Sequence, residues 1–212
     1  MPKNQCILAI DTATGPCSVA LWADGRVVGS LNDNTSSAQS ARLLPMIEKL
    51  LGQCCVSYGS LTSVACTTGP GSFTGIRVGL AAARGIAFAT KIPSIGFTTL
   101  EVMAFAARGK SPVLTALTAG KGEWYYQGFS STLAPLFAPR VGPPEEVVTS
   151  VPKGSLFAGN IAQIPVGFMA TGVTVPTASA LVTLAAEAGE NKPPLLPFYI
   201  RPPDAIIPSK TI

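Results

Sequence analysis

The first 31 residues contain three short apolar runs separated by turn-forming segments. The runs are residues 6–11 (CILAID), 17–23 (CSVALWA) and 26–31 (RVVGSL). Asp24-Gly25 separates the last two, and an Asp-Gly pair between apolar flanks favours a two-residue hairpin. The sequence therefore predicts three consecutive antiparallel strands, which excludes an all-helical fold.

The apolar period changes near Ala38. From there to residue 51 the apolar side chains recur at helical spacing: Leu43, Leu44, Ile47, Leu50 and Leu51. This spacing predicts an amphipathic helix over 38–51 that ends at Gly52. Pro45 either kinks this helix or lies in a late first turn, because proline lacks the amide donor.

Shorter elements follow in alternation. Residues 64–68 read as a buried strand, 74–90 as a helix and 95–97 as a strand. Thr98 and Glu101 have capping-box spacing, which predicts a further helix to about residue 107. The order βββαβαβα indicates an α/β fold with a mixed sheet and helices on its faces.

The composition changes after residue 109. A hairpin is predicted from 113–118 and 123–129, followed by a proline-rich region and one helix near 178–188. Adjacent aromatic residues at 124–126 point to opposite faces of a strand, so core packing is favoured over a base-stacking surface. We expect two domains, an N-terminal lobe over 1–108 and a reduced lobe over 109–212.

The chain contains no histidine, which excludes histidine-based triads and histidine-ligated metal sites. Its five cysteines show no CxxC spacing, so free thiols are expected rather than a disulfide framework or a zinc site. Its 15 basic and 11 acidic residues are scattered, which disfavours autonomous nucleic-acid binding. No catalytic residue and no metal ligand is predicted.

The N-terminal apolar run is interrupted by Asp11, and we find no later window of about 18 apolar residues free of charge, Gly and Pro. The expectation is a soluble cytoplasmic protein without a membrane partner.

Asp11 ends the first predicted strand and is followed by Thr12 and Thr14. Such a turn could present hydroxyl and amide groups to a metal-bound water or a ribose-phosphate group. The alternative is an ordinary hairpin in which Asp11 bonds the turn backbone. These three residues are weak cofactor candidates.

Residues 67–79 read TTGPGSFTGIRVG, a glycine-rich turn that leads into a helix capped by Ser72 or Thr74. The turn could cradle a phosphate, but no Lys-Ser/Thr pair follows, so it is not a Walker loop. Further small residues continue the spacing along the helix: Gly75, Gly79, Ala82 and Ala83. This stripe could receive another helix or face the chain's own sheet, whereas Ile76, Arg77 and Arg84 are expected at solvent or a partner.

Three stretches carry a family resemblance. ILAIDTATGPCSVALW, SARLLPMIEKLL and VACTTGPGSFTGIRVGLAAARGIAFATKIPSIGFTTLEVMA resemble the TsaB (YeaZ) family over residues 7–107, and the GPGSFTGIRVG block is specific to that family and its paralogue TsaD. The resemblance implies an actin/sugar-kinase/Hsp70-like (ASKHA) fold of two related lobes, the second one reduced.

The resemblance also implies a function. TsaB-like proteins do not catalyse; they pair with TsaD, which forms threonylcarbamoyladenosine next to the anticodon of tRNA. TsaD uses an HxxxH metal site, which this chain lacks. The implied partners are a TsaD-like paralogue, a TsaE-like small ATPase on the assembled pair, a second copy in isolation, and tRNA only through the complex. The resemblance leaves open ATP or ADP at the boundary with TsaD; the alternative function is a stand-alone ATP-binding or ATP-hydrolysing protein.

The resemblance places the subunit interface on the helices 38–51 and 74–89. The implied interface residues are Arg42, Leu43, Leu44, Met46, Ile47, Gly75, Ile76, Arg77, Gly79, Ala82 and Ala83. Two positions depart from the family pattern: Gln39 replaces a common histidine, and Thr118 replaces a common aspartate. Both changes weaken the case for a working polar site in the cleft.

Overall fold

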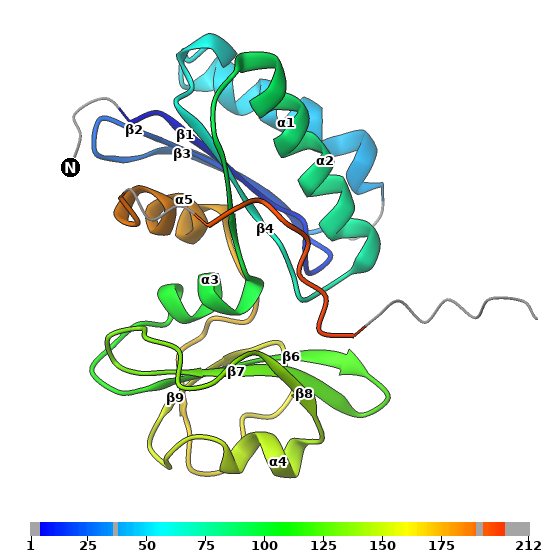
Figure 1. The fold of residues 1–212 in the computed structure, drawn as a ribbon, viewed down its shortest axis with the longest axis vertical. Helices are drawn as coiled ribbons and strands as arrows, with labels where there is room; N and C mark the ends of the chain where they lie inside the picture. Colours follow the sequence, from blue (N-terminus) through cyan, green and yellow to red (C-terminus); the bar gives the residue numbers. More distant parts are fainter. Residues whose placement is uncertain (1–4, 36–37, 190–192, 202–212) are drawn as a thin grey trace, which may run out of the picture.

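Two five-stranded mixed sheets lie one above the other in the computed structural model of the chain (Figure 1). The structure describes residues 5–35, 38–189 and 193–201. The first sheet has the strand order β3-β2-β1-β4-β5. Its strands are β1 Ile7–Asp11, β2 Cys17–Ala23, β3 Arg26–Asp33, β4 Ser63–Thr67 and β5 Ser94–Phe97.

The predicted three-stranded meander is confirmed. β1 pairs antiparallel with β2, and β2 pairs antiparallel with β3. Asp24 and Gly25 form the connection with φ angles of 52° and 77°. Two successive positive φ angles are those of the tight hairpin turn that an Asp-Gly pair favours.

The bounds of the two long helices lie within two residues of the predicted ones. α1 spans Gln39–Gln53, so Gly52 lies inside the helix rather than at its end, and Pro45 lies in the helix interior. α2 spans Phe73–Thr90, and Ser72 is its N-cap because its hydroxyl accepts the amide of Gly75 at 3.2 Å. Thr74, the other cap candidate, lies within α2.

The first sheet is covered on both faces, as the alternation along β1 requires. Leu8 and Ile10 pack in one core with α1 and α2. Ile7 and Ala9 pack on the opposite face, in a core that contains five buried side chains of α5, Ala178–Glu187. α5 closes the lower face of this sheet in Figure 1.

The position of α5 corrects the predicted domain division at residue 109. Leu181 and Val182 are fully buried against the first sheet, and the amide of Ala178 donates to the hydroxyl of Ser18 at 3.0 Å. The chain thus returns to the first lobe after building the second, because the apolar face of α5 is buried on β1 and β2.

The second sheet repeats the order of the first. Its order is β8-β7-β6-β9-β10, with strands β6 Val113–Gly120, β7 Glu123–Phe129, β8 Arg140–Gly142, β9 Leu156–Gly159 and β10 Met169–Ala170. The pairing directions also correspond, with β6-β7 and β7-β8 antiparallel and β6-β9 and β9-β10 parallel. The two lobes are therefore related structures.

The second lobe is reduced in its helices. α4, Pro144–Thr149, has six residues where α1 has fifteen, and residues 160–168, the counterpart of the α2 region, contain no helix. α3, Thr99–Ala106, lies over the other face of this sheet and begins with the predicted capping box of Thr98 and Glu101. A single-turn 3-10 helix, η1 (Tyr58–Ser60), precedes β4 in the first lobe.

The aromatic residues of β7 pack as predicted. Tyr126 is fully buried and Trp124 packs in the same core beside α4, whereas Tyr125 packs in the core beneath α3. Adjacent residues on this strand therefore contribute to opposite faces of the sheet.

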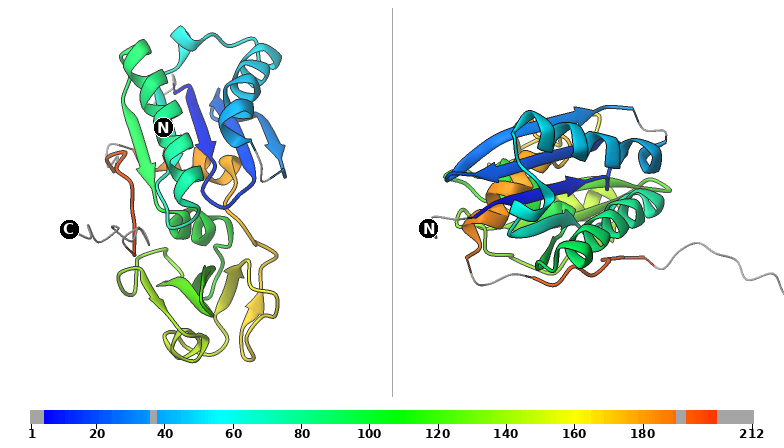
Figure 2. Two further views of the ribbon diagram at one scale, coloured as in Figure 1. Left: turned by 90° about the vertical axis from the view of Figure 1, so that its right-hand side faces the viewer. Right: turned by 90° about the horizontal axis from the view of Figure 1, so that it is seen from above.

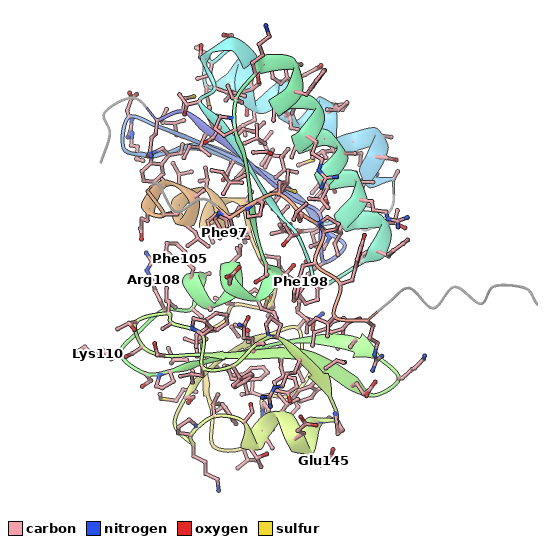
Figure 3. The ribbon with its side chains drawn as sticks, viewed as in Figure 1. Phe97, Phe105, Arg108, Lys110, Glu145 and Phe198 are labelled. Carbon is pink, nitrogen blue, oxygen red and sulfur yellow. The ribbon has the colours of Figure 1, made fainter. Side chains whose placement is uncertain are left out.

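Residues 193–201, which we call the strap, run along the outer edge of β5 toward the second lobe. The amide of Gly96 donates to the carbonyl oxygen of Pro193 at 3.0 Å, and the amide of Phe198 donates to that of Thr68 at 2.8 Å. Phe198 lies at the level where the two lobes meet (Figure 3). An ion pair between Arg201 and Glu123 joins the end of the strap to β7.

Candidate functional site

A groove of about 710 Å³ lies on the surface between α1 and α2. The two helices lie side by side, as the left view of Figure 2 shows. Most of the lining is apolar: Ser40, Leu43, Leu44, Tyr58, Val78, Ala81, Ala82, Gly85, Ile86, Ala89 and Thr90. Leu44, at 47% exposure, lines it, and Phe88 on the outer face of α2 is 88% exposed. An apolar groove that includes or adjoins exposed apolar side chains is typical of a protein-binding surface.

The sequence of α2 explains why one helix can serve both the core and the groove. Arg77 and Arg84 are its only charged residues among eighteen. Leu80 and Ala83 are buried in the core, whereas Val78 and Ala82 lie on the adjacent face and line the groove. A helix that is apolar on more than one face has a second surface to bury.

The glycine stripe of α2 does not lie on this surface. A Cβ atom at Gly75 would lie 2.1 Å from the carbonyl oxygen of Thr12, and one at Gly79 would lie 2.5 Å from the Thr12 hydroxyl oxygen. The interface assignment of Gly75 and Gly79 is therefore wrong, because both positions face the chain's own turn after β1. The alternative left open by the sequence, close packing within the chain, is the correct one.

Other implied interface residues are also buried in the chain's own core. Ile47, Ile76 and Ala83 are at most 1% exposed, so the assignment of all three to a surface is wrong, including the expectation that Ile76 meets solvent. Leu43, Leu44 and Ala82 do line the groove. Sequence spacing identified the correct pair of helices but not the orientation of α2 about its axis.

The remaining three implied residues do not line the groove. Met46 is half-buried and packs against the core. Arg42 bonds the carboxylate of Asp33 at 2.8 Å, and the guanidinium of Arg77 lies 3.6 Å from the centre of the Phe73 ring. Both arginines are therefore engaged within the chain.

A second concavity, the cleft, lies between the lobes and has a volume of about 320 Å³. The first lobe contributes the turn after β1 and the loop before α2, and the second lobe contributes the ends of β6, β7 and β9. The lining residues are Ala13, Thr14, Gly15, Gly71, Ser72, Leu117, Thr118, Ala119, Tyr125 and Asn160.

Asp11 does not line this cleft. It is 1% exposed, and its carboxylate accepts the Thr67 hydroxyl at 2.6 Å and the Ala13 amide at 3.2 Å. Burial raises the pKa of Asp11 to about 6, although the two hydrogen bonds partly oppose this change. The second bond is that of the ordinary turn that the sequence left as its alternative.

The other two cofactor candidates differ in position. Thr12 is buried beneath the turn, with its hydroxyl donating to the carbonyl oxygen of Gly75 at 2.7 Å. Thr14 lines the cleft, and its buried hydroxyl oxygen has no hydrogen-bond partner among the described residues. Of the three, only Thr14 is placed to contact a ligand in the cleft.

The cleft does not fit a nucleoside triphosphate well. Among the described residues that line it there is no Lys or Arg to neutralise phosphate charge, and the Asp11 carboxylate is turned to internal partners. Its volume is at the lower end of the range of small-molecule sites. Within the described ranges, no group of three or more Cys, Asp or Glu side chains is arranged to hold a metal ion. None of the described helices combines the length and the apolar content of a membrane span.

Two solved structures match most of the chain. YeaZ from Pseudomonas aeruginosa is 30% identical to this chain, with a TM-score of 0.81, and the match covers 92% of this chain and 99% of that one. The chain belongs to the TsaB (YeaZ) family. A second Pseudomonas aeruginosa structure, described as an uncharacterized protein with similarity to peptidase YEAZ, matches with the same identity and TM-score.

Sequence relatives agree with this assignment. The tRNA threonylcarbamoyladenosine biosynthesis protein TsaB of Escherichia coli is 42% identical over 123 residues, which are 57% of this chain and 53% of that protein. The chain thus matches about half the length of this curated TsaB relative. Residues 29–190 also match the model of the family TsaD, tRNA N6-adenosine threonylcarbamoyltransferase. The ASKHA fold of two related lobes implied by the sequence is confirmed.

The two departures from the TsaB pattern have defined places in the structure. The side chain of Gln39 is buried at the start of α1 and donates to the carbonyl oxygens of Thr12 and Gly15. Thr118 lines the cleft, where its amide donates to the side-chain oxygen of Asn160 at 2.9 Å.

Sequence reasoning missed most of the groove lining and the second-lobe side of the cleft. The missed groove residues on α2 are Val78, Ala81, Gly85, Ile86, Ala89 and Thr90. The scarcity of charged residues in α2 was the sequence signal that indicated a second buried surface on this helix. Asn160 follows β9 in an irregular loop, and no local pattern distinguishes it.

Proposed function

We propose that this TsaB-family chain is a non-catalytic subunit that binds and activates a TsaD-type threonylcarbamoyltransferase in the formation of threonylcarbamoyladenosine in tRNA. The observation that carries the proposal is the apolar groove between α1 and α2, with Leu44 and Val78 among its lining residues. The names of the curated TsaB relatives supply the pathway, and the groove supplies a surface for a partner.

The occupant of the groove that we propose is the corresponding pair of helices on a TsaD-type subunit. The TsaD family model matches residues 29–190, a range that includes both α1 and α2. A subunit of that family would therefore carry related helices, and packing them against α1 and α2 would form a four-helix arrangement. A second copy of this chain would offer the same surface, which supports a homodimer when the paralogue is absent.

Gly85 offers the sharpest test of the groove. It lies on α2 in the groove lining, and a Cβ atom there would have nothing within 4 Å, so Gly85→Trp places a large side chain at the groove from an open position. Gly52→Trp on α1 is the matched control, because Gly52 is equally open but does not line the groove. Binding is measured by titration calorimetry with a purified TsaD-type subunit.

We expect Gly85→Trp to weaken binding by about a hundredfold or more, as for the centre of an interface, and Gly52→Trp to leave it within about threefold. A reconstituted assay should show loss of modified adenosine for Gly85→Trp alone. Equal binding by both variants would contradict the proposed interface. Modified adenosine formed without this chain, at the rate seen with it, would contradict the activating role.

The alternative is a chain that binds or hydrolyses ATP by itself, with the cleft as its site. The unpartnered hydroxyl of Thr14 favours some polar ligand there, whereas the absence of Lys and Arg from the described lining disfavours a triphosphate. Titration calorimetry of the isolated chain with ATP and Mg²⁺ separates the two functions, because submillimolar binding would favour the alternative. A TsaE-like ATPase and tRNA are proposed to meet only the assembled pair, and ATP or ADP would then bind at its subunit boundary.

A further inference from the structure

The turn formed by residues 12–15 lies between the N-terminal ends of the two groove helices. From the α2 side, the Thr12 hydroxyl donates to the carbonyl oxygen of Gly75 at 2.7 Å, and the amide of Ser72 donates to that of Ala13 at 2.6 Å. From the α1 side, the side-chain amide of Gln39 donates to the carbonyl oxygen of Thr12 at 3.2 Å and to that of Gly15 at 2.6 Å. Both helices are therefore bonded to one turn.

Among the described residues, few other polar groups stabilise the start of α1. Its N-cap residue, Ala38, has a φ angle of 57° and no capping side chain, and the first turn contains no acidic residue. Arg42 bonds Asp33, but both side chains are partly exposed, and such pairs contribute little to stability. Gln39 is buried, so water does not replace its bonds when they break, and their loss is costly.

The opposite side of the turn lines the cleft, through Ala13, Thr14 and Gly15. The groove and the cleft consequently share one structural element, although their lining residues differ. We propose that Gln39 is a positioning residue that fixes α1 to this turn, sets the spacing of the groove helices, and couples occupancy of the groove to the geometry of the cleft. The identification of the groove as a partner-binding site rests on the proposed function, whereas the coupling between the groove and the cleft does not.

Gln39→Met tests the link, because methionine keeps the length of the side chain and removes both donors. Amide hydrogen exchange in the full chain should become about tenfold faster at residues 13–15 and also at residues 41–44. Gln127→Met is the matched control: Gln127 is buried in the second lobe, and its side-chain amide donates to the carbonyl oxygen of Phe137 at 3.0 Å. Exchange at 13–15 that is unchanged in Gln39→Met, or raised equally by Gln127→Met, overturns the proposal.

The coupling is tested with a groove filled by mutation instead of by a partner. Gly85→Trp should shift the amide resonances of residues 13–15 in the parent chain, and these shifts should fall severalfold in the Gln39→Met background. Equal shifts in both backgrounds, or none in the parent, overturn the coupling. If Gln39→Met does not fold, Thr12→Val removes the bond from the α2 side and is judged by the same exchange rates. Because these measurements use no partner, failure of the chain to bind a TsaD-type subunit refutes the proposed function separately.

Discussion

The hydroxyl of Thr12 donates to the carbonyl oxygen of Gly75 across 63 positions of sequence, at a distance of 2.7 Å. This bond shows what the glycine-rich segment before and within α2 accomplishes. Cβ atoms at Gly71, Gly75 and Gly79 would each lie within 2.5 Å of an atom of Thr12 or Ala13. Because these three residues are glycines, α2 lies directly against the turn after β1. The glycine-rich segment therefore packs against the chain's own backbone.

The first prediction compares two glycines of the same helix. Gly79→Ala should lower the free energy of unfolding by about 1–3 kcal/mol, because its Cβ atom would lie 2.5 Å from the Thr12 hydroxyl and 3.1 Å from the Cys66 sulfur. Gly85→Ala has open space and should raise it by about 0.5–1 kcal/mol through helix propensity. Urea denaturation measures both, and equal effects of the same sign would contradict the assigned orientation of α2.

Local chemistry made much of the first lobe predictable. The Asp24-Gly25 hairpin, the Ser72 cap and the Thr98-Glu101 capping box each depend on residues a few positions apart, and the structure contains all three. The orientation of α2 was not accessible in this way. Spacing shows that Gly75 and Gly79 share a face, but what that face meets depends on Thr12, which is more than sixty residues away in sequence.

The places of α5 and of the strap, which the sequence did not predict, also depend on distant contacts. The helix α5 has an apolar face that would suit either sheet, and its place is decided by Ser18 and the first core. The strap has no hydrophobic period, and its course along β5 depends on Gly96, where a Cβ atom would lie 2.7 Å from the carbonyl oxygen of Pro194. The two helices of the groove and Thr14 of the cleft could therefore be predicted from the sequence, whereas the residues packed around them could not.

Asp11 makes the stability of the first lobe depend on pH. Burial raises its pKa from 3.8 to about 6, so the folded state holds this proton more tightly than the unfolded state does. The contribution of the protonated Asp11 side chain to stability is fully present below about pH 4 and is lost as the pH rises through about 6. Its total size is about 3 kcal/mol, from the conversion of about 1.4 kcal/mol per pKa unit. Asp11→Asn keeps an oxygen that can accept the bonds from Thr67 and Ala13 and removes the charge.

Asp11→Asn should therefore be only slightly more stable than the parent at pH 4. At pH 7 its free energy of unfolding should exceed that of the parent by about 2–3 kcal/mol. Asp33→Asn provides a comparison of opposite sign. Hydrogen bonds from Thr35, and after them the ion pair with Arg42, lower the pKa of Asp33, so its contribution is lost as the pH falls. Chemical denaturation at several pH values measures both differences, and a difference for Asp11→Asn that does not change between pH 4 and 7 would refute the burial of its charge.

Two adjacent leucines of the strap provide the last prediction. Leu195 is 6% exposed and packs in the core with Leu80 and Ile76, whereas Leu196 is 60% exposed. Leu195→Ala should lower the free energy of unfolding by about 2–3 kcal/mol, because it leaves a cavity between the strap and α2. Leu196→Ala should change it by less than about 0.5 kcal/mol.

Limited proteolysis should also cut residues 193–201 faster in Leu195→Ala, since Leu195 helps to hold the strap on α2. Equal cutting and equal stability of the two variants would show that the strap is not part of the first core, and the bond from Arg84 to the carbonyl oxygen of Leu195 at 2.8 Å would then not suffice to hold it.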